Sequence, residues 1–154
     1  MSNMPSMTTF DTGALFLQSV PFARTLGVSF DSVESGTAVA RLADRPDLHN
    51  HVGGPHAGVV FSLAESASGA AMLSLFGDTL DRATPLATVG RVAYKKLALG
   101  DLTAEAVVRA EREAVLAELA ARQRPEFTVE VTVRNAEGAT VAEVTVEWTL
   151  RPNR

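Results

Sequence analysis

The sequence predicts an α+β domain in which an antiparallel β-sheet wraps around one long central α-helix. Residues 57–75 are apolar or small almost throughout and do not alternate, which favours a buried helix over a strand. Residues 102–110, 128–134 and 142–150 alternate apolar and polar side chains, as half-buried strands do. A chain of 154 residues is long enough to build one domain with its own core.

The first residues of the chain are polar, and the ordered domain is expected to begin just after them. Residues 1–9 are predicted to be a disordered tail, and residues 10–154 a single domain. Residues 11–19 favour a short helix that stops before Pro21, because the residue preceding a proline avoids the helical conformation.

Two strands and a loop are expected between this helix and the central one. Strand-like residues begin at Leu26, a turn falls at Ser35-Gly36, and a second strand covers 37–42. Asp, Pro, Asn and Gly dominate residues 44–55, which indicates a loop.

The second half of the chain is predicted to be mostly strand. The central helix ends at Gly77-Asp78, and the remaining segments are predicted from periodicity and turn residues. In chain order they are a strand over 87–96, a strand over 102–110, an amphipathic helix over 113–123, a strand over 128–134, a hairpin turn over 135–138 and a strand over 142–150.

Composition excludes several classes of function. The net charge of −4 argues against a nucleic-acid-binding surface. The absence of cysteine excludes disulfides and thiolate metal sites. The apolar segment 57–76 contains Glu65 and four serines, so it is interpreted as a buried helix rather than a membrane span. No signal peptide is recognisable, and a cytoplasmic protein without a membrane partner is expected.

Glu65 is the strongest candidate for chemistry. It is the only formally charged residue between Asp47 and Asp78. A carboxylate in apolar surroundings is costly to bury and tends to have a perturbed pKa, and such groups cluster at functional sites.

The segment ahead of Glu65 carries a recognisable motif. Asn50, Gly53, His56, Gly58 and Glu65 fall at the spacing found in the hotdog-fold thioesterases, and the chain resembles most closely their PaaI-like acyl-CoA thioesterase branch. The resemblance covers residues 22–151 and implies a hotdog fold. Two positions depart from the pattern: Ala57 replaces the first glycine of a His-Gly-Gly run, and the acid is Glu rather than the commoner Asp.

The resemblance implies hydrolysis of an acyl-CoA or aryl-CoA thioester, without a metal or other cofactor. Glu65 would act as general base or nucleophile, and backbone N–H groups near Gly58 as oxyanion donors. Asn50 would orient the water or the thioester, and Thr88 is the nearest match to a helper Ser or Thr. His56 is expected mainly to be a structural residue at the helix start, and a catalytic role is its second interpretation.

The same resemblance implies a homodimer or homotetramer with sites at the subunit interface. Glu65 lies seven residues beyond Gly58, or about 10 Å along a helix, so one chain does not bring both to the same carbonyl carbon. Coenzyme A phosphates are expected to be bound by Arg91, Lys95 and Lys96. Ala57 is expected to lie close to the ligand. Tyr94 and Trp148 are expected in the core.

Three alternatives remain open at this point. His49, His51, His56 and Glu65 offer ligands for zinc or iron, although a Gly/Pro-rich loop is a poor frame for them. His51 and Glu65 have the spacing of a hotdog hydroxyacyl dehydratase. The third alternative is a non-catalytic module that binds acyl-CoA or another small ligand.

Overall fold

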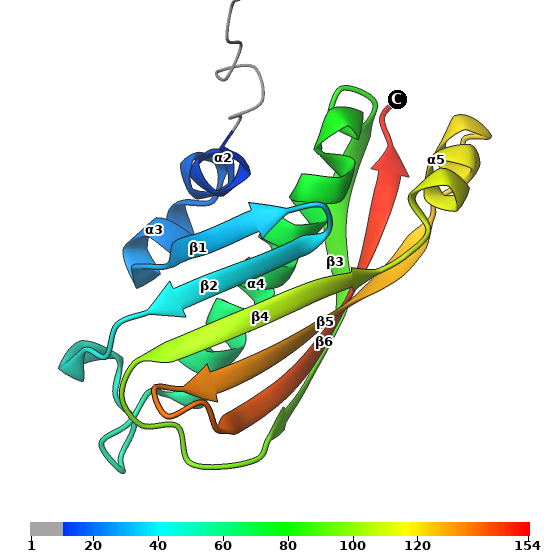
Figure 1. Ribbon diagram of the computed structural model, residues 1–154. Helices are drawn as coiled ribbons and strands as arrows, with labels where there is room; N and C mark the ends of the chain where they lie inside the picture. The colour runs from blue at the N-terminus through cyan, green and yellow to red at the C-terminus, as the bar shows by residue number, and fades with distance from the viewer. Residues whose placement is uncertain (1–10) are drawn as a thin grey trace, which may run out of the picture.

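The computed structural model describes residues 11–154, and the tail predicted for residues 1–9 lies outside them (Figure 1). Six strands form one antiparallel sheet in the order β1-β2-β4-β5-β6-β3. The sheet curves around one long helix, α4, so the predicted α+β layout is confirmed. The strands are β1 (Ser29–Glu34), β2 (Thr37–Leu42), β3 (Ala83–Tyr94), β4 (Leu102–Arg109), β5 (Glu126–Asn135) and β6 (Thr140–Pro152).

The helices occupy three places around the sheet (Figure 1). The central helix α4 (Ala57–Phe76) lies against the concave face of the sheet, and the two short helices at the beginning of the described chain lie beside β1. The helix α5 follows β4 at the far end of the sheet. Their bounds are α2 (Thr12–Ser19), α3 (Pro21–Leu26) and α5 (Arg112–Ala120), and single turns of 3-10 helix cover Pro46–Leu48 (η1) and Gly77–Thr79 (η2).

The core lies between α4 and the concave face of the sheet. Small residues on α4 let the strands approach closely, and valines and alanines at alternate positions of the strands pack against them. Trp148 is buried as predicted, and its indole N–H donates to the Ser68 hydroxyl of α4. α4 is long and apolar enough to cross a membrane, but most of it is covered by the sheet. It is therefore the core helix of the domain.

The convex face of the sheet is polar. Threonines and cross-strand ion pairs alternate there with the core residues, including Arg109 with Glu130 and Arg134 with Glu105. No helix of the described chain covers this face (Figure 1).

Two elements differ from the sequence prediction. The first helix ends at Ser19, before Pro21, as predicted, but Pro21 then begins a second helix, α3, that was not predicted; proline is well suited to the first position of a helix. β3 begins at Ala83 rather than residue 87, and it ends at Tyr94, so Lys95 and Lys96 lie beyond it. Its early start includes Pro85, which an edge strand tolerates because one side of its backbone needs no partner.

Candidate functional site

The loop ahead of α4 is closed by the side chain of Asn50. The Oδ1 atom of Asn50 accepts hydrogen bonds from the N–H groups of Val52 (3.0 Å) and Gly54 (3.2 Å). The Asn50 N–H donates to the Gly54 carbonyl at 2.7 Å, and Gly53 has a φ of 80°, which glycine adopts without strain. Asn50 thus shapes the turn that delivers His56 to the start of the helix, and it also lies on the wall of the cavity beside it.

His56 is the N-cap residue of α4. Its Nδ1 atom accepts a hydrogen bond from the Gly58 N–H at 2.8 Å. The Gly58 N–H, predicted as an oxyanion donor, therefore has a partner in the free protein. The Ala57 N–H belongs to the same first turn and makes no hydrogen bond within residues 11–154. The positive end of the helix dipole is centred on these two N–H groups.

A cavity of about 380 Å³ opens at this helix start. Four of the predicted site residues, Asn50, Ala57, Lys95 and Lys96, line it. Its remaining wall comes from the loop, from α4, from the end of β3 and the segment after it, and from β6, namely Pro55, Val60, Tyr94, Leu97, Ala98 and Val141. The sequence-predicted residues at the start of α4 thus share a hollow with the end of β3.

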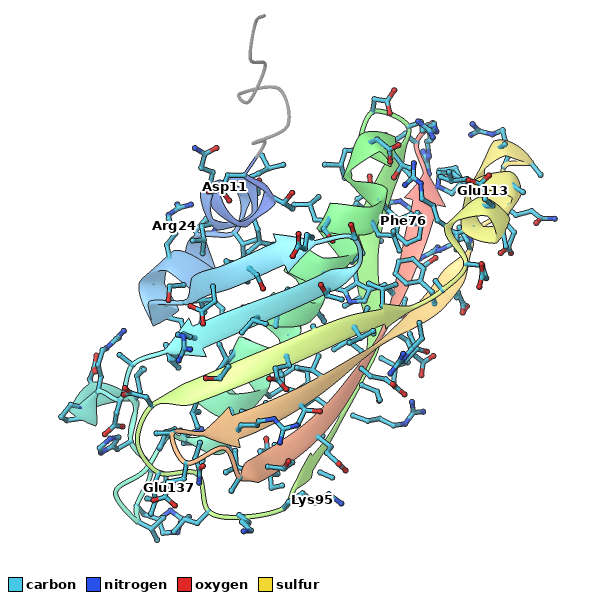
Figure 2. The ribbon with its side chains drawn as sticks, viewed as in Figure 1. Asp11, Arg24, Phe76, Lys95, Glu113 and Glu137 are labelled. Atoms are coloured by element: carbon cyan, nitrogen blue, oxygen red, sulfur yellow. The ribbon has the colours of Figure 1, made fainter. Side chains whose placement is uncertain are left out.

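The cations predicted to meet coenzyme A phosphates are divided between two faces. Lys95 lies just beyond β3, at the end of the sheet where Glu137 lies (Figure 2), and its ammonium group is 3.5 Å from a Glu143 carboxylate oxygen. Lys96 makes no ion pair with the described residues. Arg91 does not line the cavity: it forms a 2.7 Å ion pair with Glu147, opposite Thr145 in the sheet. Lys96 is therefore better placed than Arg91 to meet a phosphate.

Glu65 lies two turns along α4 from the helix start and is partly buried. Its carboxylate makes no ion pair or hydrogen bond within the described part of the chain. Burial raises the pKa of the Glu65 carboxyl above its ordinary value of 4.5. Because no neighbouring cation offsets this effect, the carboxyl favours its protonated form more than an exposed glutamate does.

The space between Glu65 and the helix start is occupied by Phe61. A Cβ atom added at Gly90 of β3 would lie 2.7 Å from Phe61 Cζ, so the phenyl ring packs directly on the glycine backbone. Phe61 is one turn from Ala57 and one turn from Glu65. The helix start, Phe61 and Glu65 therefore form one stripe along the side of α4 that faces β3.

Thr88 is the extra residue of a β-bulge in β3. The pairing with β6 shifts between Ala87, opposite Trp148, and Val89, opposite Glu147. The Thr88 hydroxyl donates to the Glu147 backbone carbonyl at 3.2 Å and makes no hydrogen bond to Glu65 in the described structure. Thr88 also lies outside the cavity lining, so its role as a helper residue stays a prediction.

The three histidines are not gathered around Glu65. His49 binds Asp44 at 2.7 Å, His51 lies exposed in the loop, and His56 caps the helix. Residues 11–154 contain no group of three or more His, Asp or Glu side chains placed to hold a metal ion. Within one chain, this arrangement does not favour the metal-enzyme alternative.

Tyr94 is the main residue that the sequence assigned wrongly. It was expected in the core, yet 50% of it is exposed, and it lines the cavity. Its hydroxyl donates to the Ala57 carbonyl at 2.9 Å. Tyr94 does face α4, but its residue type could not show that the end of an edge strand stays open to solvent.

Comparison with solved structures identifies the fold family. PA5026 from Pseudomonas aeruginosa, a protein of unknown function described as a probable thioesterase, is 27% identical, with a TM-score of 0.80 over 92% of this chain and 94% of that one. The PaaI protein of Escherichia coli, from the phenylacetic acid degradation operon, is 20% identical, with a TM-score of 0.73 over 92% and 91%. The SAV0944 thioesterase of Staphylococcus aureus, in a mutant form, is 17% identical, with a TM-score of 0.72 over 86% and 100%.

These similarities confirm a hotdog fold and place the protein in the thioesterase superfamily. The chain belongs to the family described as "Domain of unknown function (DUF4442)", whose profile matches residues 11–150. No curated protein matches the sequence.

Proposed function

We propose that this protein hydrolyses an acyl-CoA or aryl-CoA thioester to the free acid and coenzyme A. The observation that carries the proposal is Glu65: a partly buried carboxyl with a raised pKa and no neighbouring cation, on the helix whose start opens into a cavity. A general base works best when its pKa lies near the working pH, and burial moves the pKa of Glu65 in that direction.

Two ends of the stripe on α4 act in the reaction: Glu65 provides the base, and the helix start provides the oxyanion donors. Glu65 takes a proton from water, and the water oxygen forms a bond to the thioester carbon. The developing oxyanion accepts hydrogen bonds from N–H groups at the helix start. The C–S bond then breaks, and the sulfur leaves as a thiolate that takes up a proton. Direct attack by the Glu65 carboxylate, with an anhydride that water then hydrolyses, uses the same geometry.

The thioester oxygen has to compete with His56 for the Gly58 N–H. In the free protein that N–H donates to His56 Nδ1, so the imidazole must turn away before Gly58 can serve the oxyanion. The Ala57 N–H needs no such change, because it makes no hydrogen bond within the described chain. We therefore assign Ala57 as the first donor and Gly58 as the second.

A second copy of the chain completes the site in this proposal. Glu65 is about 10 Å from Gly58 along the helix, too far for both to act on one carbonyl carbon. β3 is an edge strand with most of its residues exposed, so its backbone can pair with the same strand of another copy. Such a pairing brings the Glu65 stripes of two helices to one interface. Glu65 of one subunit then serves the helix start of the other.

The cavity fits the carrier end of the substrate. Two of the residues that line it, Leu97 and Tyr94, are about half exposed, and their apolar surface suits a pantetheine arm. The ammonium group of Lys96 suits a phosphate.

The test is thiol release from a panel of acetyl-, hexanoyl-, benzoyl- and phenylacetyl-CoA. Glu65→Gln and Glu65→Ala are each expected to lower kcat by about 10²–10⁴-fold, the usual contribution of a general base. Glu118→Gln is the matched control, because Glu118 is a helical glutamate on the exposed side of α5. Activity that survives both changes at Glu65 contradicts the assignment.

A non-catalytic binding module is the second candidate. The hydrogen bond between His56 and Gly58 favours it, since a permanently occupied N–H group would serve as a helix cap and not as an oxyanion donor. Calorimetry with the same CoA thioesters separates the two functions. Saturable binding without thiol release supports the module, and thiol release that depends on Glu65 rejects it.

A further inference from the structure

One peptide group at the start of α4 is held at both of its polar atoms. The carbonyl of Ala57 and the N–H of Gly58 belong to the same planar unit. The Tyr94 hydroxyl donates to the carbonyl oxygen at 2.9 Å, and His56 Nδ1 accepts from the N–H at 2.8 Å. Within a helix this carbonyl already faces the N–H of Phe61, so Tyr94 supplies an additional donor.

Tyr94 reaches this peptide group from a different element. It is the last residue of β3, opposite Ala142 of β6, whereas Ala57 is the first residue of α4. The hydrogen bond therefore ties the open end of the edge strand to the helix start across 37 residues of sequence. Half of the tyrosine is exposed, and it forms part of the cavity wall.

Resting on the proposed function, we propose that Tyr94 is the positioning residue of the second oxyanion donor, the Gly58 N–H. A rigid donor must point at the place where charge develops, because reorientation during the reaction costs free energy. The Tyr94 hydroxyl fixes the plane of the Ala57–Gly58 peptide from its carbonyl side. Donation to the carbonyl also polarises the peptide, which makes its N–H a stronger donor.

The two partners of this peptide act differently during the reaction. His56 occupies the N–H only until the thioester oxygen replaces it. Tyr94 stays bound to the carbonyl, on the side of the peptide that the substrate does not need. The Gly58 N–H thus keeps its direction when the imidazole turns away. With Tyr94 in place, the Gly58 N–H can donate to His56 in the free protein and to the oxyanion during the reaction without a change in its orientation.

Tyr94→Phe removes only the hydroxyl and leaves the ring in the cavity wall. With the CoA thioester that the wild type hydrolyses fastest, kcat is expected to fall about tenfold while KM stays within about twofold, because an indirect effect is smaller than the loss of a whole donor. The matched control is Ser19→Ala, which removes another hydroxyl that donates to a helix carbonyl, that of Leu15, on α2. Equal losses in both variants, or an unchanged kcat in Tyr94→Phe, overturn the proposal.

A second readout needs neither substrate nor activity. In the ¹⁵N-resolved spectrum of the whole protein, the Gly58 amide resonance is expected to shift in Tyr94→Phe and not in Ser19→Ala. An unchanged Gly58 amide overturns the positioning role whatever the kinetics show. If the wild type releases no thiol from the panel, the proposed hydrolysis fails. A shifted amide then still shows that Tyr94 orients the peptide, in a protein that binds its ligand without turnover.

Discussion

The two edge strands of the sheet, β1 and β3, are built in opposite ways. β1 has six residues, and α2 packs beside it, with Phe16 meeting Phe30 edge-to-face at 5.7 Å. Its register shifts between Phe30 and Ser32, and an Arg41–Asp31 ion pair ties it to β2. β3 has 12 residues, and no described element lies beyond its outer edge (Figure 1).

This difference supports β3 as the edge of the proposed dimer. A short, irregular and charged edge strand with a helix beside it discourages pairing with another sheet, and β1 has these features. β3 is long and carries exposed apolar side chains such as Val89, which is 37% exposed. It also lies next to the stripe of α4 that holds Phe61 and Glu65. The edge left open is therefore the edge beside the candidate site.

The largest expected effect comes from breaking the β3 edge. Val89→Asp places a charge, and a residue that disfavours strands, where two copies would face each other across a twofold axis. We expect the dimer to become a monomer and thiol release to fall by at least about 10²-fold, because each site loses half of its groups. Sedimentation and the thiol assay measure both effects.

The other edge provides the control for this change. Ser32→Asp puts the same charge on the exposed edge of β1, where we expect neither the mass nor the activity to change. A monomeric wild type, or a Val89→Asp protein that remains an active dimer, contradicts the functional role of β3.

A smaller effect concerns the pH dependence of stability. Burial raises the pKa of Glu65 in the folded protein above its ordinary value of 4.5, so between these two pKa values the folded state binds more protons than the unfolded state. The contribution of Glu65 to the free energy of unfolding is therefore most favourable below about pH 4, and it is lost as the pH rises through the folded pKa. Glu65→Gln, which has no charge to bury, should become more stable than the wild type as the pH rises.

Urea unfolding between pH 3.5 and 8 measures this difference, and the same measurement tests whether a second copy covers the β3 edge. A second copy on β3 buries Glu65 further, so the wild-type dimer should show a larger stability gain on Glu65→Gln at neutral pH than the Val89→Asp background does. A wild type that is as stable as Glu65→Gln throughout this range would show that Glu65 is not perturbed.

The sequence predicted those helices and strands whose burial leaves a periodic pattern of apolar residues. The central helix was found because residues 57–75 are apolar without alternation, and β4, β5 and β6 because one face of each is buried. The early start of β3 was missed, since its first residues, 83–86, are buried or half-buried without alternation and include Pro85. α3 was missed because Pro21 was interpreted only as the end of a helix.

The candidate site could be predicted only in part for the same reason. The motif located the helix start and Glu65, which depend on local sequence spacing. The contacts of Tyr94 with Ala57 and of Phe61 with Gly90 join residues far apart in the chain, and no local pattern encodes them. Arg91 was grouped with Lys95 and Lys96 by nearness in sequence, but strand alternation turns it toward Glu147, outside the cavity.

Complementation tests most directly whether Glu65 of one subunit serves the helix start of its partner. Gly58→Pro removes the Gly58 N–H within the first helical turn, where a proline is tolerated. Glu65→Gln removes the base. Each homodimer should lose at least about 10²-fold in thiol release, because every site lacks either the base or one of its two oxyanion donors, whereas a dimer of one Glu65→Gln chain and one Gly58→Pro chain holds one intact site.

In a 1:1 mixture exchanged to equilibrium, half of the dimers are mixed, so thiol release should return to about a quarter of the wild-type rate by random pairing. Mixed dimers that are isolated and remain as inactive as either parent would contradict the claim, because base and oxyanion donors would then belong to one chain.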